Sequence, residues 1–321
     1  SESIPPEVYD CSFSFPDSSA LNPKTAVYED LINDITASGV PGIMMSITTP
    51  EDGEWLGASG MADIKSNVRI KSCNITRVGS TVKTFTAVTI LILSEEGLLS
   101  LDDKINRYLP GSLLDKLENA NECTIRQLLH HTSGIYNYIQ SLSFQTASIN
   151  DLGKVWQPED LLKYAYGRPA VFKPGEDAQY SNTNYILLGM IIEKITGKPF
   201  YEVFKVKIFE PLHLLNTRFA AEDPVPENII RGYIDLYSNL QVIESTHYSG
   251  WDYFTADGGL ISNAHDLSLF MRKLFDGGLL SSGSLNEMLT WQPPRDADPE
   301  FYPLDFGLGI FRIETPYGVA Y

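Results

Sequence analysis

The chain has 321 residues, of which 43% are hydrophobic and 20% are charged, and its formal net charge is −17. This composition is typical of a globular protein with a substantial core and argues against a disordered chain. A strongly acidic protein is repelled by nucleic-acid phosphates and by anionic lipid, so neither is an expected partner. The longest apolar run, residues 85–93, is too short to cross a bilayer.

The cysteines and histidines indicate no metal site and no cofactor. Cys11, Cys73 and Cys123 lie far apart and permit one disulfide at most, and we expect three separate thiols. No Cys-x-x-Cys pair and no metal-binding histidine spacing is present. His130 and His131 end a predicted helix, where we expect them to make structural hydrogen bonds.

The first predicted elements are a helix and a hairpin. Residues 1–23, rich in Pro and Ser, predict an extended leader on the surface. Apolar residues at helical spacing predict a helix over residues 24–38, which ends at Gly39. Residues 42–49 and 54–62 predict two strands joined by a Pro-Glu-Asp-Gly turn. This order indicates an antiparallel sheet with a helix on one face.

The middle of the chain is predicted to be mainly helical. Residues 85–93 are apolar on nearly every side and predict a buried helix that ends at Gly97. Capping signals and a proline at a first turn predict further helices over residues 124–130, 158–166 and 184–195.

Toward the end of the chain the pattern changes again. Small residues at 256–262 lead into a predicted helix over residues 264–275. The alternating residues 306–313 predict one strand, which breaks at Pro316.

These elements predict an α+β fold, an antiparallel sheet flanked by helices with an inserted all-helical lobe. Residues 1–75 would supply the leader, the first helix and the hairpin of the sheet layer. Residues 76–250 would form a mainly helical lobe that carries the active-site motifs. Residues 251–321 would return to the sheet layer. No repeat or linker divides the chain.

One constellation at the start of the apolar helix could carry chemistry. Ser80 and Lys83 are three residues apart, so on a helix they share a face and the amine could reach the hydroxyl. Main-chain N–H groups at the helix terminus would favour a developing oxyanion at this point. A lysine, whose ordinary pKa is ~10.4, serves as a base only where its surroundings lower that value.

A second element, Tyr180-Ser181-Asn182, precedes the helix predicted over residues 184–195. In extended backbone the side chains of Tyr180 and Asn182 point the same way. Tyr180 could shuttle a proton, and Asn182 could orient Lys83 or a substrate carbonyl. The structural alternative is a tyrosine at the edge of the core followed by an N-capping asparagine.

Four runs occur in order along the chain, at residues 77–83, 131–135, 180–185 and 258–262. Together they resemble the serine β-lactamase and penicillin-binding-protein superfamily on its class C side. Within it, the likeness is to Streptomyces-type D-Ala-D-Ala carboxypeptidases and to D-stereospecific amidases and aminopeptidases. The resemblance extends over nearly the whole chain and implies the same α+β architecture.

The resemblance also implies a role for each motif residue. Ser80 would be the nucleophile that becomes acylated, and Lys83 would accept its proton. Tyr180 would deliver the proton to the leaving group and later activate water, while Asn182 would hold the substrate amide. The main-chain N–H of Ser80 would supply half of the oxyanion hole.

Four further residues match substrate-binding positions of the carboxypeptidase branch. Phe144 and Tyr253 match walls of the cleft, although ordinary packing explains both equally well. Phe311 stands where that branch has an arginine that grips a substrate carboxylate, and Arg312 follows it. Because strand side chains alternate, Arg312 would face away from the cleft unless a bulge shifts the register. Phe311 would then offer an apolar wall suited to a neutral leaving group.

The chain departs from the family pattern at its end. The third motif, K-T-G or H-x-G on a strand, is expected shortly after residues 317–321. The run at 247–250 looks similar but lies upstream of residues 258–262, which excludes it as a substitute. We expect the closing strands and the C-terminal helix of the sheet to be missing, as in a fragment or a chain completed by a partner.

The sequence therefore predicts a serine hydrolase that forms an acyl-enzyme at Ser80 and acts on D-amino-acid peptides, amides or esters. One alternative is a β-lactamase or esterase of the same fold. Another is a catalytically silent homologue that binds a penicillin or a peptide. The expected ligands are small peptides, amides, esters or β-lactams. The family's substrates favour a secreted or periplasmic location, and a cytoplasmic one stays open.

Overall fold

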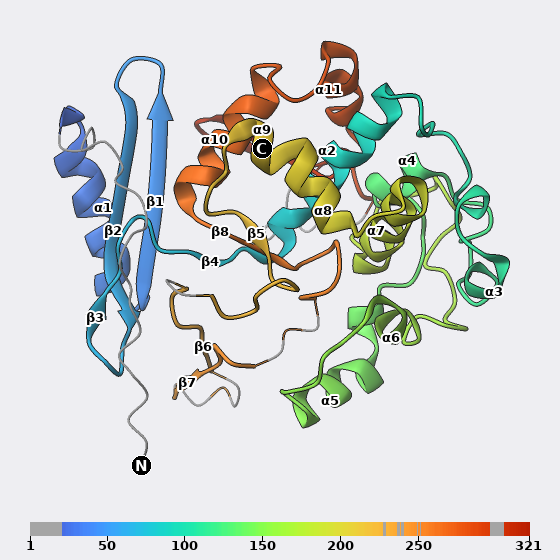
Figure 1. The fold of residues 1–321 in the computed structure, drawn as a ribbon, viewed down its shortest axis with the longest axis horizontal. Helices are drawn as coiled ribbons and strands as arrows, with labels where there is room; N and C mark the ends of the chain where they lie inside the picture. The colour runs from blue at the N-terminus through green and yellow to red at the C-terminus, as the bar shows by residue number, and fades with distance from the viewer. Residues whose placement is uncertain are drawn as a thin grey trace. The chain divides into compact units, whose positions relative to one another are not determined.

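A computed structural model describes residues 21–226, 229–235, 238, 241–248, 250, 252–295 and 305–321. The predicted leader, residues 1–23, lies almost wholly outside these ranges. The chain divides into two compact units, each built from separate segments (Figure 1). Unit 1 comprises Ser1–Arg77, Leu214–Tyr248 and Ile261–Arg272, and unit 2 comprises Val78–His213, Ser249–Leu260 and Lys273–Tyr321.

Unit 1 contains the predicted helix and hairpin. Its elements are α1 (Thr25–Ala37), β1 (Gly42–Thr49), β2 (Gly53–Asp63), β3 (Val68–Arg69), β4 (Thr76–Arg77), β5 (Arg218–Phe219), β6 (Tyr233–Ile234), β7 (Ile243–Glu244) and most of β8 (Leu260–Ser262) and α10 (Ala264–Phe275). The strands β1, β2 and β3 form an antiparallel sheet, and α1 lies along it (Figure 1). The ring of Trp55 in β2 packs 5.2 Å from that of Tyr28 in α1.

Unit 2 is mainly helical. Its elements are η2 (Gly79–Thr81), α2 (Val82–Glu95), η3 (Ile105–Arg107), α3 (Gly111–Leu114), α4 (Ile125–Leu129), η4 (Tyr138–Gln140), α5 (Leu142–Asn150), α6 (Pro158–Leu162), α7 (Asn182–Thr196), α8 (Phe200–Phe204), η5 (Lys205–Phe209), α9 (Glu210–Leu212), α11 (Ser282–Met288), β9 (Asp305–Phe306), β10 (Phe311–Thr315) and β11 (Gly318–Ala320). The helices α2 and α7 pack against each other and are buried along most of their lengths. A helix that is apolar on all sides lies in the core, because other elements must cover every face to keep it from water.

These elements confirm the predicted α+β class, since helices combine with antiparallel sheets. The hairpin, α7 and α10 stand where the patterns predict them. The helix expected over residues 85–93 begins earlier, at Val82, so Lys83 belongs to its first turn.

The prediction of one strand over residues 306–313 is wrong, because the chain folds there into a hairpin of β9 and β10. Gly309 has a φ of +72°, and a Cβ at this position would come within 2.4 Å of the Cβ of Ala87 in α2. Its carbonyl accepts a hydrogen bond of 2.8 Å from the Thr84 hydroxyl. The turn is therefore set by close packing on α2. The strand β10 ends at Thr315, directly before Pro316, where the sequence predicts the break.

The expectation of three separate thiols is also wrong. Cys73 is disulfide-bonded, and Cys123 is a buried free cysteine. Cys11 lies outside the described residues. Burial raises the pKa of the Cys123 thiol to about 12, so it stays protonated at physiological pH.

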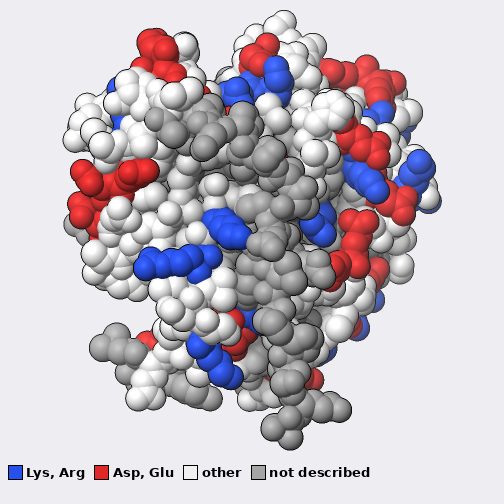
Figure 2. Space-filling view, turned by 60° about the vertical axis from the view of Figure 1, so that its left-hand side comes forward, with Lys and Arg blue, Asp and Glu red and all other residues white. Residues whose placement is uncertain are grey.

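The surface carries charged side chains of both signs. On the face drawn in Figure 2, acidic side chains form several separate groups, with basic side chains between some of them. Within the described ranges, no helix combines the length and apolar composition that a bilayer crossing requires. Within the same ranges, no group of three or more His, Cys, Asp or Glu side chains is arranged to hold a metal ion.

Candidate active site

Ser80 and Lys83 lie at the junction of η2 and α2, in unit 2. Ser80 is exposed in the short 3-10 turn, whereas Lys83, one turn further along, has only 4% of its surface exposed. The Lys83 Nζ donates a hydrogen bond of 3.0 Å to the Ser80 Oγ. The junction thus presents a hydroxyl to solvent and keeps the amine that contacts it in the interior.

The Ser80 hydroxyl has a second partner, although Tyr180 is 100 residues away in the sequence. The Tyr180 Oη donates a hydrogen bond of 2.8 Å to the Ser80 Oγ. The Lys83 Nζ also lies 5.0 Å from the centre of the Tyr180 ring. One exposed hydroxyl therefore contacts two groups that can each take up or give a proton.

Asn182 stands at the first position of α7, two residues after Tyr180. Its main-chain N–H and its side-chain Nδ2 donate to the Asn137 Oδ1, at 3.2 and 3.5 Å. The Asn137 Nδ2 in turn donates to the Tyr180 carbonyl at 3.4 Å. Among the described hydrogen bonds, none joins Asn182 to Lys83. The asparagine pair holds the start of α7, and Asn137 is a residue that sequence reasoning missed.

His131 supports the Tyr180 segment from the other side. Its Nδ1 accepts a hydrogen bond of 3.1 Å from the Ser181 N–H, and its ring lies 4.6 Å from that of Tyr180. Burial, the nearby Lys83 charge and His130 hold the His131 pKa well below its usual range. His131 is therefore neutral, and its hydrogen bond is structural, as we expect from its position at a helix end.

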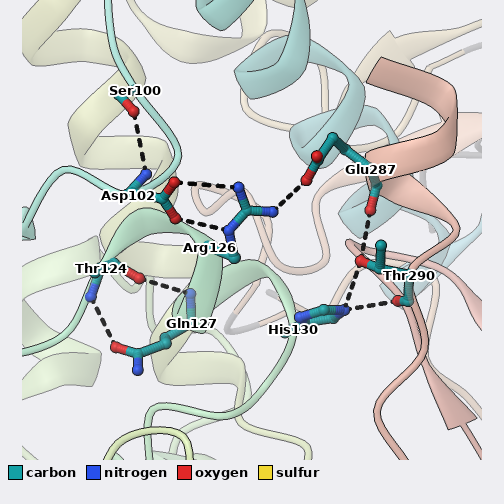
Figure 3. Close-up of polar contacts among 8 residues, drawn as sticks. All are labelled: Ser100, Asp102, Thr124, Arg126, Gln127, His130, Glu287 and Thr290. Atoms are coloured by element: carbon teal, nitrogen blue, oxygen red, sulfur yellow. Dashed lines mark hydrogen bonds and ion pairs between the residues drawn. The ribbon is translucent and has the colours of Figure 1, made fainter. Parts of the chain in front are cut away.

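Helix α4 directly precedes His130 and His131, and Figure 3 draws polar contacts of this helix and of His130. Thr124 and Gln127 form a capping box at its start. Arg126 pairs with Asp102 at 2.8 Å and with Glu287 of α11 at 2.5 Å. The next residue after the helix, His130, bonds through its Nε2 to the Thr290 carbonyl at 2.7 Å.

A buried carboxyl group lies behind Lys83. The Asp257 carbonyl accepts a hydrogen bond of 2.5 Å from the Lys83 Nζ, and its Oδ2 accepts one of 3.1 Å from the Tyr138 Oη. Burial raises the pKa of Asp257, and the Lys83 charge opposes that change. Burial and the Asp257 charge also raise the Tyr138 pKa well above its usual value. Sequence reasoning did not single out Asp257. It is the one charged residue of the small-residue run at 256–262, and this is the signal that could have indicated it.

The structure places Phe144 and Tyr253 in the core. The Phe144 ring packs edge-on against Tyr138, Trp156 and Tyr164, at 5.1, 5.5 and 5.3 Å. Tyr253 is buried, and its ring fills the space beside the Cα of Gly250. Phe144 contacts Tyr138, whose phenol donates a hydrogen bond to Asp257.

Phe311 and Arg312 lie on opposite sides of β10, as strand alternation predicts. The Phe311 ring is 6.1 Å from that of Tyr180. The Arg312 Nε donates to the Asp305 Oδ2 at 2.8 Å, and its guanidinium lies 5.3 Å from the centre of the Trp291 ring. The structure therefore brings Phe311 to the site and ties Arg312 to other partners.

Comparison with known proteins identifies the class. The family model described as Beta-lactamase matches residues 29–320, so the chain belongs to this family, and its fold is a serine hydrolase fold. This confirms the resemblance seen in the four sequence motifs.

Individual relatives refine the picture. A D-stereospecific amidohydrolase from Streptomyces sp. is 32% identical, with a TM-score of 0.80 over 92% of this chain and 85% of that one. The D-amino acid amidase from Ochrobactrum anthropi SV3 is 26% identical, with a TM-score of 0.80 over 92% of this chain and 82% of that one. A penicillin-binding protein of Bacillus subtilis (strain 168) is 31% identical over 80% of this chain and 56% of its own length. The chain spans about half the length of the curated relatives it matches.

Proposed function

We propose that the chain hydrolyses D-amino-acid amides, esters or peptides through an acyl-enzyme at Ser80. The observation that carries this proposal is the contact of one exposed hydroxyl with both the Lys83 amine and the Tyr180 phenol. A serine is a weak nucleophile until a neighbouring base accepts its proton, and this geometry supplies two such neighbours.

In the proposed reaction, the Ser80 Oγ attacks the substrate carbonyl while its proton passes to the Lys83 amine. The bond to the leaving group then breaks, and Tyr180 delivers a proton to that group. A water molecule gives a proton to Tyr180 and attacks the acyl-enzyme, and the acid leaves as Lys83 returns its proton to the Ser80 oxygen. The main-chain N–H of Ser80 would stabilise the oxyanion in both steps. Asn182, paired with Asn137, would hold the substrate amide.

The substrate class rests on Phe311 and on two relatives. An aromatic ring beside Tyr180 offers no charge to a carboxylate, which favours a neutral leaving group. The Streptomyces and Ochrobactrum relatives are a D-stereospecific amidohydrolase and a D-amino acid amidase. Such substrates, together with the disulfide at Cys73, support a location outside the cytoplasm, because disulfides persist in oxidising compartments.

The test is covalent labelling. Incubation with a fluorophosphonate, followed by intact mass and peptide mapping, should place one adduct on Ser80. Ser80→Ala should remain folded and unlabelled, while Ser133→Ala, which changes a buried serine outside the Ser80 contacts, should still be labelled. A folded parent protein that takes up no adduct would instead support the catalytically silent homologue.

A substrate panel separates the hydrolase alternatives. We expect turnover of D-amino-acid amides and esters to exceed that of the L-enantiomers. The alternative of a β-lactamase or an esterase would be favoured if a penicillin or a simple short-chain ester were hydrolysed faster than any D-amino-acid amide.

A further inference from the structure

Four aromatic side chains next to Ser80 contact one another in a closed ring. His131 packs on Tyr180 with 4.6 Å between the ring centres, and Tyr180 packs on Phe311 at 6.1 Å. Phe306 closes the set, because its ring lies edge-on to Phe311 at 5.2 Å and to His131 at 5.5 Å. Aromatic side chains attract one another at these separations. We call these four residues the aromatic cluster.

Two members of the aromatic cluster are interior and two reach the surface. His131 and Phe306 are 2% and 8% exposed, whereas Tyr180 and Phe311 are half-buried. The Tyr180 Oη donates to the Ser80 Oγ, so the outer pair of rings begins at the proposed nucleophile. A substrate whose carbonyl group lies at Ser80 therefore has aromatic surface within reach.

The β9–β10 hairpin, which carries Phe306 and Phe311, is held by two helices. The Gly309 carbonyl accepts a hydrogen bond of 2.8 Å from the Thr84 hydroxyl of α2. The Gly309 N–H donates to the Leu129 carbonyl of α4 at 3.3 Å. Because the turn is fixed to both helices, the Phe311 ring is in place before a substrate arrives. A surface that is already ordered binds a ligand with little loss of conformational entropy.

The aromatic cluster contributes no cation to the site. Burial and the nearby Lys83 charge hold the His131 pKa well below its usual range, so this ring is neutral. The Arg312 guanidinium pairs with Asp305, on the side of β10 opposite to Phe311. An uncharged aromatic surface favours apolar groups, and it favours an aromatic ring over a saturated ring of the same size.

We propose that Tyr180 and Phe311 bind an aromatic group of the substrate on the leaving-group side of the scissile bond, with Phe306 as a positioning residue for the Phe311 ring. The side is assigned from Tyr180, which would give its proton to the leaving group. Suitable substrates are D-amino-acid amides or esters whose departing amine or alcohol carries an aromatic ring. This inference rests on the proposed function, because it names the leaving group of the same reaction.

The experiment compares D-alanine benzylamide with D-alanine cyclohexylmethylamide by the release of the amine. The two amines have the same carbon skeleton, but only benzylamine has an aromatic ring. We expect kcat/KM to be about two- to tenfold higher for the benzylamide, a difference of ~0.5–1.4 kcal/mol. Phe311→Leu keeps an apolar side chain without an aromatic ring, so the ratio of the two kcat/KM values should fall toward one.

Phe209→Leu is the matched control. Phe209 is 6% exposed and packs edge-on against Phe85, with Phe204 as a second aromatic neighbour. The substitution removes a buried phenylalanine outside the aromatic cluster, so the ratio should stay at the parent value. Any difference in the intrinsic reactivity of the two amides is the same for every variant and cancels when their ratios are compared.

Phe306→Leu provides a second variant should Phe311→Leu fail to fold. It removes the edge contact that holds the Phe311 ring, so the ratio should fall, by less than in Phe311→Leu. In the double variant the change at Phe306 should have no further effect on the ratio, which a merely structural role would not produce.

A parent ratio of one or less, or a parent ratio kept in the folded variants, would overturn the inference. Hydrolysis of D-alaninamide without hydrolysis of either ring-bearing amide would also overturn it, and would leave the proposed function intact. A parent protein that is not labelled at Ser80 would instead contradict the proposed function, and the inference with it.

Discussion

The imidazole of His131 accepts a hydrogen bond from the N–H of Ser181, the residue that directly follows Tyr180. The same ring packs against those of Tyr180 and Tyr185, at 4.6 and 5.1 Å. A neutral histidine is required, because a protonated ring would lose its acceptor at Nδ1 and bring a positive charge close to Lys83. The position of Tyr180 is thereby coupled to the protonation state of a buried histidine.

Stability should consequently fall in mild acid. Folding holds the His131 pKa well below its value of ~6.5 in the unfolded chain. Below pH ~6.5 the unfolded state takes up a proton that the folded state refuses, so the free energy of unfolding drops by up to about 1.4 kcal/mol per pH unit, until the folded pKa is reached. Above that pH the contribution is complete.

His131→Asn tests this, because an asparagine oxygen can replace Nδ1 and asparagine tolerates the φ of +59° at this position. Urea unfolding at several pH values should show a shallower acid dependence in this variant than in the parent. His213→Asn is the matched control, since that histidine lies outside the Tyr180 contacts and has a φ of +54°. Equal slopes in His131→Asn and the parent would contradict the prediction.

Tyr180→Phe should lower kcat for a D-amino-acid amide by about 100-fold or more, the usual effect of removing a general acid–base group. KM should change little, because the ring stays and only the hydrogen bond to Ser80 is lost. Tyr164→Phe, in the aromatic core around Phe144, should retain a kcat near that of the parent. An unchanged kcat in Tyr180→Phe would remove this residue from the catalytic set.

The leaving-group preference should follow Phe311. For matched substrates, kcat/KM should be at least about tenfold higher with a terminal carboxamide than with a carboxylate, a difference of ~1.4 kcal/mol. Phe311→Leu should keep this preference, whereas Phe311→Arg should reverse it, because a guanidinium pairs with a carboxylate. A parent enzyme that prefers the carboxylate would show that the apolar wall does not govern selection.

Arg126 should contribute to stability modestly and in a salt-dependent way. Its side chain is 29% exposed, and those of its partners Asp102 and Glu287 are 72% and 48% exposed. Replacement by Met should lower the free energy of unfolding by about 1 kcal/mol, because both ion pairs are exposed to water. The loss should be smaller in high salt, because dissolved ions screen the charges. Labelling at Ser80 should be unaffected, since α4 keeps its capping box and the His130 bond to Thr290. A loss independent of salt would show that packing of the arginine stem dominates.

Elements with local signals could be predicted from the order of the amino acids. The hairpin over β1 and β2, the helix α10 and the approach of Lys83 to Ser80 each depend on residues a few positions apart. Such features follow from side-chain periodicity and from turn and capping chemistry, which act within one or two turns of chain. The strand predicted over residues 306–313 failed for the converse reason, because its break at Gly309 depends on contact with α2, which is distant in the sequence.

Contacts between groups that are far apart in the sequence could not be predicted in this way and are seen in the folded protein. Tyr180 reaches Ser80 across 100 residues of sequence, and Asp257 reaches Lys83 across 174. It also separated Phe144, which packs in the aromatic core, from Phe311, which lies beside Tyr180. A motif specifies the local conformation and chemistry of its residues but not the partner they face. That partner depends on the simultaneous packing of several elements, because each side chain is positioned by neighbours from all of them.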